Sequence, residues 1–205
     1  MEEWNKYFID NTNVLKNKLQ ITDKDKLNEM ERKIVFKKLT YLGIAPIKGN
    51  FDAQHLCMIH QFLFNDIYEF AGKYRTCTLA KPKCQFMDPK YIDKELNRVL
   101  NHLNEQIKNI VSLDQYIYLL APTYYELTVI HPFREGNGRA IREFMREFVE
   151  AKNNELPFDV KLDLTKIDKN QALLAVQERY IYPSLLEEVF RGAIVELDNE
   201  KNKRR

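Results

Sequence analysis

Side chains suited to chemistry at a phosphate gather in one short segment in the second half of the chain. The segment runs from His131 to Arg142 and reads His-Pro-Phe-Arg-Glu-Gly-Asn-Gly-Arg-Ala-Ile-Arg. Gly136 and Gly138 permit backbone conformations that other residues resist. Successive amides in such a turn, leading into a helix N-terminus, form a concave site for an anion. The segment therefore predicts an anion-binding loop between two helices.

The charged and titratable side chains of this segment extend that prediction. Arg139 and Arg142 would lie on one face of the following helix, where their guanidinium groups suit bidentate contact with phosphate. Glu135 is a hard oxygen ligand that suits Mg²⁺ shared with a polyphosphate, and His131 is the obvious general base. Such a set suits attack by a hydroxyl on a phosphorus atom of a nucleotide.

Each of these residues also has a purely structural interpretation. A histidine before proline commonly ends a helix, Gly-Asn-Gly is a common turn, and Glu135 would favour the positive end of the next helix. The conjunction within one segment favours the functional interpretation. Other chemistries fit less well, because the glycine pattern lacks the spacing and the Lys-Ser/Thr of a P-loop. His55 and His60 are also off the i,i+4 spacing that places two metal ligands on one helix face.

The composition is that of a globular chain. Of its 205 residues, 44% are hydrophobic and 12% aromatic, which excludes a disordered or low-complexity protein. With 32 Lys and Arg against 30 Asp and Glu, the net charge of +2 demands no direct nucleic acid partner. Three cysteines, no signal-peptide pattern and no run of the ~20 apolar residues that a membrane helix needs predict a cytoplasmic protein with no membrane partner.

Helical periodicity dominates the chain and predicts a mostly α-helical fold. Asp88 before Pro89 indicates one helix start, and Ser112 with Gln115 indicates a second. Pro122 is expected to kink the helix that contains it. The expected helices cover about residues 24–42, 52–69, 88–110, 112–130, 138–153, 165–178 and 184–196.

Residues 73–87 have a different pattern. Two short runs with alternating and β-branched residues flank Lys81-Pro82-Lys83, which predicts a small hairpin. With no third strand to pair with, such a hairpin is marginally stable in water unless something packs or binds against it. We therefore expect a binding flap rather than an element of the core.

The segment from His131 to Arg142 resembles the signature of the Fic family, His-x-Phe-x-(Asp/Glu)-Gly-Asn-Gly-Arg-x-x-Arg, with every specified position filled. Residues 56–75 resemble the helix and turn that precede the family's flap, and residues 11–19 resemble the N-terminal segment of bacterial cell-filamentation-type Fic proteins. The resemblance implies an all-α Fic-type helical domain with one small β-hairpin flap. Its expected parts are a single domain over residues 1–205, with an N-terminal helical arm (about 1–45), a Fic core (about 50–192) and a short charged tail (193–205).

The resemblance also implies an activity, the transfer of AMP from ATP to a hydroxyl of a target protein with release of pyrophosphate. His131 would take the proton from a Ser, Thr or Tyr hydroxyl of the target, which attacks the α-phosphorus. Glu135 would hold the Mg²⁺ that bridges the α- and β-phosphates. ATP and Mg²⁺ are thus the expected cofactors.

The nucleotide and the target would be held by different parts of the domain. The amides of Gly136 and Gly138, with the Asn137 side chain, would cradle the phosphates. Arg139 would hold the β-phosphate side and Arg142 the γ-phosphate. The flap would hold the target segment by strand addition. Its docking residues would be Thr76, Cys77, Thr78, Leu79, Lys83, Gln85 and Phe86.

Many Fic proteins are silenced by a helix that carries (Ser/Thr)-x-x-x-Glu-(Gly/Asn), whose glutamate pairs with the second arginine. In this chain only Ser184 and Glu188 fit the first part of that pattern, and Val189 fails its last position. The resemblance therefore implies that a separate small antitoxin supplies the inhibitory helix, and that the chain is the toxin half of the pair. Family members of that kind modify subunits of DNA topoisomerases.

Two alternatives belong to other functional classes. One is a phosphotransferase of the Doc type, which binds the nucleotide reversed; the loop of that branch lacks the Gly-Asn-Gly-Arg pattern. The other is a catalytically silent Fic-like binding module, which would be expected to lack His131 or an arginine. This chain has the histidine and both arginines, His131, Arg139 and Arg142.

Overall fold

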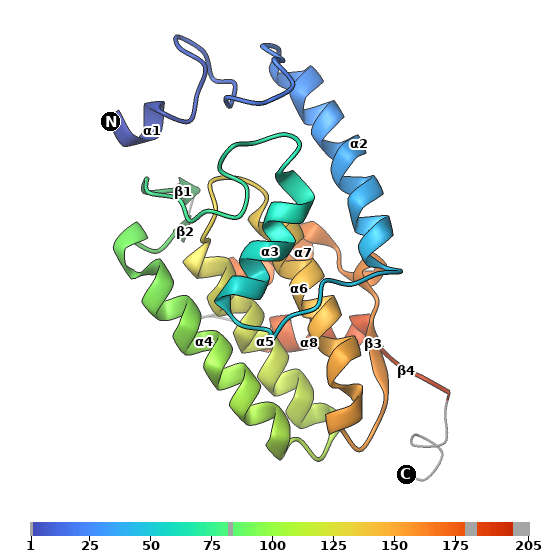
Figure 1. Ribbon diagram of the computed structural model, residues 1–205. Coiled ribbons are helices and arrows are strands. Elements are labelled where there is room, and N and C mark those ends of the chain that lie inside the picture. The colour runs from blue at the N-terminus through green and yellow to red at the C-terminus, as the bar shows by residue number, and fades with distance from the viewer. Residues whose placement is uncertain (1, 82–83, 179–183, 199–205) are drawn as a thin grey trace.

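The computed structural model describes residues 2–81, 84–178 and 184–198, and most of these residues are helical (Figure 1). Its α-helices are α1 (Glu2–Asn5), α2 (Lys24–Leu42), α3 (Ala53–Phe64), α4 (Ile92–Gln106), α5 (Leu113–Ile130), α6 (Asn137–Lys152), α7 (Lys169–Gln177) and α8 (Leu185–Ala193). Short 3₁₀ turns are η1 (Pro89–Tyr91), η2 (Ile107–Asn109), η3 (Asn153–Glu155) and η4 (Leu164–Lys166). The strands are β1 (Ala80–Lys81), β2 (Cys84–Gln85), β3 (Val160–Leu162) and β4 (Ile194–Glu196). The predicted mostly α-helical fold with a small hairpin is confirmed.

Side-chain caps set several helix starts where the sequence predicts them. Asp23 accepts a hydrogen bond from the amide of Lys26 at 2.8 Å at the start of α2. Asp88 caps the turn that leads into α4, and Ser112 accepts from the amide of Gln115 at 3.3 Å at the start of α5. Each cap satisfies an amide that has no partner inside the helix. The helix α5 continues through Pro122.

The helix predicted over residues 52–69 is shorter in the structure, because α3 ends at Phe64. The Lys38 ammonium from α2 donates to the Phe62 carbonyl at 2.7 Å and to Asn65 Oδ1 at 2.5 Å, and it also pairs with Asp66 at 2.7 Å. A cation at a helix C-terminus satisfies the carbonyls that the helix leaves unpaired. A side chain remote in sequence thus stabilises the end of α3.

A second small sheet lies outside the sequence prediction. β3 pairs with β4 in antiparallel register, with Val160 opposite Glu196 and Leu162 opposite Ile194. The helix expected over 184–196 therefore ends at Ala193, and residues 193–196 lie in α8 and β4 rather than in a charged tail. Strands of three residues carry too few positions for an alternating pattern to be recognised.

The helix α5 is central to the packing, since it contacts α4, α6 and α8. α3 packs on α6, and α2 lies on the outer side of α3 (Figure 1). Fully buried core side chains on α3, α5 and α6 include Ile59, Leu63, Leu120, Leu127, Phe144 and Phe148. The loop between α5 and α6, residues 131–136, is thus anchored at both ends by buried helices. Among the residues described, no helix is long and apolar enough to cross a lipid bilayer.

Candidate active site

The loop between α5 and α6 turns at two residues with left-handed backbone. His131 ends α5 with φ 49°, and Gly136 begins α6 with φ 85°. A Cβ on Gly136 would lie 2.3 Å from the Phe64 ring. Both the backbone angle and this close approach require glycine at position 136. The predicted helix start near Gly138 is confirmed to within one residue, since α6 begins at Asn137.

Asn137 braces this loop from within. Its Oδ1 accepts a hydrogen bond from the Phe133 amide at 2.8 Å, and its Nδ2 donates to the Phe133 carbonyl at 2.7 Å. The residue is only 2% exposed. The Asn137 side chain, predicted to cradle phosphates, thus also holds the backbone of the loop, using its Oδ1 and one of the two N–H donors of Nδ2.

His60 holds the same loop from α3, a role that the sequence did not reveal. Its Nε2 donates to the Glu135 carbonyl at 2.8 Å, and its Nδ1 accepts from the Gly72 amide at 2.8 Å. The ring stacks on Phe133 with centroids 3.8 Å apart. Burial lowers the pKa of His60 to about 4, so the ring is neutral. The available signal was a histidine among the apolar residues of α3.

The imidazole of His131 lies at the start of the loop. Its Nδ1 is 3.1 Å from the Thr128 carbonyl oxygen. Since a carbonyl can only accept, Nδ1 carries the proton and Nε2 is the nitrogen with a lone pair. The Phe86 ring stacks on the imidazole at 3.7 Å, with 13° between the planes. This arrangement presents one defined tautomer, as a general base requires.

Arg75 ties the flap to the end of α5. It is 2% exposed, and it donates to the carbonyls of His131 and Cys77 at 2.7 Å and of Met87 at 2.5 Å. It also donates to the Ile130 carbonyl at 3.2 Å. Burial lowers the pKa of its guanidinium. Arg75 therefore connects the backbone of the predicted base, His131, to both ends of the flap. The sequence prediction did not include Arg75 among the site residues.

The N-terminal arm covers the other side of the loop. The Arg134 guanidinium lies under three aromatic rings of the arm, 4.3 Å from the ring centre of Trp4, 5.0 Å from Phe8 and 5.6 Å from Tyr7. The Tyr7 hydroxyl also accepts from the Thr76 amide at 3.2 Å at the base of the flap. Cation–π contacts thus join the arm to the loop, and the Tyr7 hydrogen bond joins the arm to the flap.

Arg139 and Glu135, which the sequence predicts as phosphate and metal ligands, lie together. Arg139 Nη2 is 3.4 Å from Glu135 Oε1, which also accepts from the Gly136 amide at 2.9 Å. Arg139 Nη1 donates to Glu31 of α2 at 2.6 Å, and Glu31 in turn accepts a hydrogen bond from the Tyr68 hydroxyl. Burial beside Glu31 raises the pKa of Tyr68. Glu31 and Tyr68 are site residues that the sequence analysis did not predict.

Glu135 is the carboxylate available for a metal. Its side chain is 45% exposed, unlike that of Glu31. No group of three or more His, Cys, Asp or Glu side chains that could hold a metal ion occurs in the described parts of the chain. One exposed carboxylate fits Mg²⁺, which commonly binds through one or two carboxylates together with substrate phosphates and water.

Arg142 differs from Arg139 in its surroundings. Over residues 2–81, 84–178 and 184–198 it has no hydrogen bond or ion pair. Its Nη1 would lie 3.2 Å from a Cβ built on the exposed Gly138, so the guanidinium lies over the first turn of α6. Glu188 of α8 is exposed, and in the described part of the chain it makes no ion pair with Arg142.

The predicted flap forms a hairpin, in which Ala80 pairs with Gln85 and Lys81 with Cys84. The side chains of Cys77, Leu79 and Phe86 pack in a small cluster with Tyr7, so they do not face outward as docking residues would. Thr76 and Thr78 are exposed. Lys83 lies outside the described residues.

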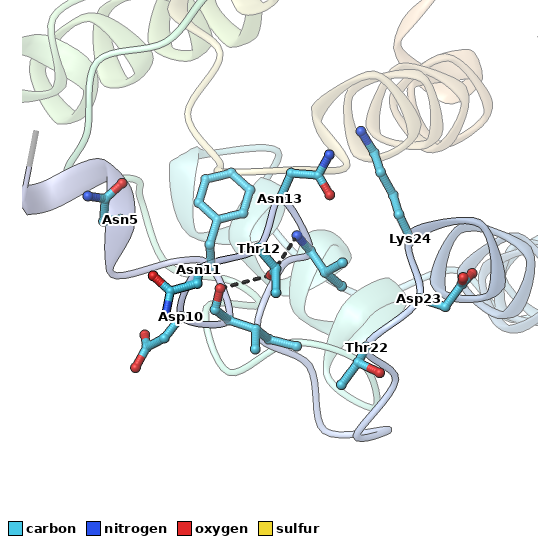
Figure 2. Close-up of a pocket in the computed structure, with 11 residues that line it drawn as sticks. Asn5, Asp10, Asn11, Thr12, Asn13, Thr22, Asp23 and Lys24 are labelled. Atoms are coloured by element: carbon cyan, nitrogen blue, oxygen red, sulfur yellow. Dashed lines mark hydrogen bonds between the residues drawn. The ribbon is translucent and has the colours of Figure 1, made fainter.

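A separate hollow of about 770 Å³ lies within the arm, between the turn at residues 9–14 and the start of α2 (Figure 2). The turn is held by Thr12, whose hydroxyl donates to the Ile9 carbonyl at 2.8 Å and accepts from the Val14 amide at 3.1 Å. None of the residues that line this hollow belongs to the segment 131–142.

Known proteins share this combination of fold and loop. The Fic/DOC family profile matches residues 50–149. The chain is 33% identical over 150 residues to the protein adenylyltransferase VbhT of Bartonella schoenbuchensis, covering 72% of this chain and 31% of VbhT. It is 31% identical to the probable protein adenylyltransferase y4lH of Sinorhizobium fredii, covering 71% of this chain and 75% of that protein.

The fold of the chain is also similar to that of solved structures. The crystal structure of BepC from Bartonella tribocorum, with bound AMPPNP, superposes with a TM-score of 0.83 at 28% identity, covering 95% of this chain and 98% of that one. The N-terminal Fic domain of a putative cell filamentation protein from Bartonella quintana, with bound ADP, has a TM-score of 0.83 at 25% identity, over 95% of this chain and 96% of that chain. The signature loop, the helical fold and these relatives together show that the chain belongs to the Fic/DOC family.

Proposed function

We propose that the protein is a protein adenylyltransferase, which transfers AMP from ATP to a Ser, Thr or Tyr hydroxyl of a target protein. The observation that carries this proposal is the pairing of a tautomer-fixed imidazole, His131, with the glycine turn that opens α6. The relatives named as protein adenylyltransferases support the same activity. The chain spans 31% of the length of VbhT. The activity is therefore proposed from the residues of this chain and not from the activity of the whole of VbhT.

In the proposed reaction the target hydroxyl oxygen attacks the α-phosphorus of ATP. His131 Nε2 takes the hydroxyl proton as the new P–O bond forms. The bond between the α-phosphorus and the bridging oxygen breaks, and that oxygen leaves with the pyrophosphate. Glu135 would hold a Mg²⁺, whose chemistry would be to offset the negative charge of the phosphates.

The remaining residues of the segment would hold the nucleotide. Backbone amides at Gly136 and Gly138, at the positive end of α6, suit the phosphates. Arg139 is assigned the β-phosphate side and Arg142 the γ-phosphate. In this proposal Asn137 fixes the loop backbone through Phe133 and would offer the second N–H of its amide to the phosphates.

The target would pair with the backbone edge of the flap, next to His131. Strand addition needs main-chain groups rather than outward side chains, so the inward packing of Cys77, Leu79 and Phe86 is compatible with it. The exposed Thr76 and Thr78 would then contact the target directly.

We also infer the setting in which the enzyme acts. A single Fic-type domain, with its arm over about residues 1–45 and its core over about residues 50–192, is supported by the contacts of Trp4, Tyr7 and Phe8 with Arg134. We infer that a separate antitoxin inserts a glutamate against Arg142. This is supported by the incomplete inhibitory motif of this chain, in which Ser184 and Glu188 fit but Val189 does not. The cytoplasm is the expected location, and topoisomerase subunits are the first targets to test.

Labelled ATP separates the candidate reactions. The protein, its His131→Ala variant and a His102→Ala control, which changes an exposed histidine of α4, are incubated in cell lysate with ATP and Mg²⁺. We expect label in a target band from α-labelled ATP, none from γ-labelled ATP, and a loss of about 10²–10⁴-fold in His131→Ala alone.

The other outcomes favour the alternatives. Transfer of the γ-label would identify a Doc-type phosphotransferase. No transfer of either label, with nucleotide binding retained, would identify a silent binding module.

A further inference from the structure

Glu31 connects the outer helix α2 to the segment that would bind the nucleotide. It lies 108 residues before Arg139 in the chain, yet its Oε1 accepts from Arg139 Nη1 at 2.6 Å. Its Oε2 accepts from the Tyr68 hydroxyl. Glu31 is 6% exposed, and each of its carboxylate oxygens accepts a hydrogen bond from a protein group.

The contact between Glu31 and Arg139 would persist when a nucleotide binds. A buried carboxylate without a paired and hydrogen-bonded cation destabilises the folded state. Separating Arg139 from Glu31 would therefore cost free energy. The other acidic contact of Arg139 is longer, at 3.4 Å, and involves the half-exposed Glu135. Glu135 is therefore the partner that can move away toward a metal.

The position of the guanidinium is fixed in a second direction by an aromatic ring. Arg139 Cζ lies 4.8 Å from the ring centre of Phe64. Phe64 is fully buried and also closes against Gly136 at the start of α6. The Arg139 guanidinium is thus held by two groups, the Glu31 carboxylate and the Phe64 ring.

A guanidinium has five N–H donors in a rigid fork. One Nη1 donor meets Glu31, which leaves donors on the same group for a phosphate oxygen. We propose that Glu31 is a positioning residue, which holds Arg139 so that its remaining donors meet the β-phosphate of the bound nucleotide. Arg142 has no such support within the described residues, so it can adapt to the γ-phosphate.

This inference rests on the proposed function, and nucleotides of different length test it. AMP has no β-phosphate, whereas ADP has one, so loss of the positioning should weaken ADP binding and spare AMP binding. The test compares dissociation constants for AMP and ADP, measured by calorimetry on the full chain and on Glu31→Gln. Glutamine removes the charge and keeps only one acceptor oxygen, in place of the two that serve Arg139 and Tyr68.

A control and a milder variant accompany Glu31→Gln. Glu29→Gln changes an exposed glutamate of the same helix, which pairs with Lys33. Tyr68→Phe removes the hydroxyl that holds Glu31 while keeping the carboxylate. If Glu31→Gln does not fold in a thermal melt, Tyr68→Phe decides the question.

We expect Glu31→Gln to weaken ADP binding about tenfold, the low end for loss of one charged hydrogen bond, and to leave AMP binding within about twofold. Tyr68→Phe should weaken ADP binding in the same direction but less, and Glu29→Gln should change neither constant. The KM for ATP in AMP transfer should rise with Glu31→Gln by a similar factor.

Three results would overturn the positioning role: unchanged ADP binding, tighter ADP binding, or equal weakening of AMP and ADP. In each of these cases the unaltered protein still binds and transfers AMP, so the proposed function stands. If the unaltered protein binds no nucleotide at all, the proposed function fails, and the role of Glu31 fails with it.

Discussion

The rings of Phe86 and His131 lie face to face, with centroids 3.7 Å apart. Phe86 directly follows β2, and its amide donates to the Leu79 carbonyl at 3.2 Å across the hairpin. His131 belongs to the end of α5, so this stack joins the flap to the proposed base. A target strand added to the edge of the flap would thus lie next to His131, the proposed acceptor of the target's hydroxyl proton.

The stack predicts that Phe86→Leu lowers the rate of AMP transfer. Leucine keeps an apolar side chain in the cluster with Cys77 and Leu79 but cannot stack on the imidazole. Aromatic pairs contribute about 0.5–1.5 kcal/mol beyond burial, so a loss of about 2- to 10-fold in kcat is expected. Single-turnover transfer measures it, with nucleotide affinity unchanged.

Phe36→Leu is the matched control, since Phe36 is 71% exposed on α2. If Phe86→Leu transfers AMP as fast as the natural protein, the stack does not orient His131.

The glycine at position 136 predicts a second outcome. Gly136→Ala must adopt φ 85° and bring its Cβ to 2.3 Å from the Phe64 ring. Left-handed strain costs about 1–2 kcal/mol, and overpacking adds about 1–3 kcal/mol. We expect a loss of about 3 kcal/mol in the free energy of unfolding, measured with urea, together with loss of AMP transfer.

Gly192→Ala is the comparison, because a Cβ there meets nothing within 4 Å. It lies inside α8, where alanine is the better helix former, so stability should rise slightly. Equal stability of Gly136→Ala and the natural protein would show that the loop has another conformation.

The sequence predicts the local parts of this site well and the long-range ones poorly. Asp88 and Ser112 each act on amides two or three residues away, so their capping roles could be predicted from short patterns. The segment from His131 to Arg142 likewise carries its own turn residues. Local rules of capping and conformation suffice for such features.

Other features depend on which remote side chains meet. Lys38 ends α3, His60 holds Glu135, and Glu31 holds Arg139, across separations of 24, 75 and 108 residues. No spacing rule connects such pairs, because tertiary packing decides them. The bonds of the Asn137 side chain to the Phe133 backbone are likewise visible only in the folded loop.

His60 predicts a pH dependence of stability. Its pKa is about 4 in the folded protein, because of burial, and about 6.5 in an unfolded chain. As the pH falls below 6.5, the unfolded state takes up the proton first, so stability decreases until the pH reaches about 4. The expected loss from this group is about 2 kcal/mol between pH 7.5 and pH 5.

Urea unfolding at the two pH values measures this loss. His60→Gln, which cannot titrate, should be less stable at pH 7.5 but should lack that part of the pH dependence. If the natural protein and His60→Gln lose the same stability on acidification, His60 is not the group responsible.

The two arginines of the segment predict different effects on stability. Arg139→Ala leaves Glu31 buried without its cation, which costs about 3 kcal/mol or more. Arg142→Ala removes a side chain with no ion pair in the described chain, so stability should stay within about 0.5 kcal/mol. Urea unfolding of both variants should therefore separate them, although both lose AMP transfer. Adding Glu31→Gln to Arg139→Ala should restore part of the stability, since no buried charge remains. A double variant no more stable than Arg139→Ala would mean that the cost lies in lost packing on Phe64 rather than in the unpaired carboxylate.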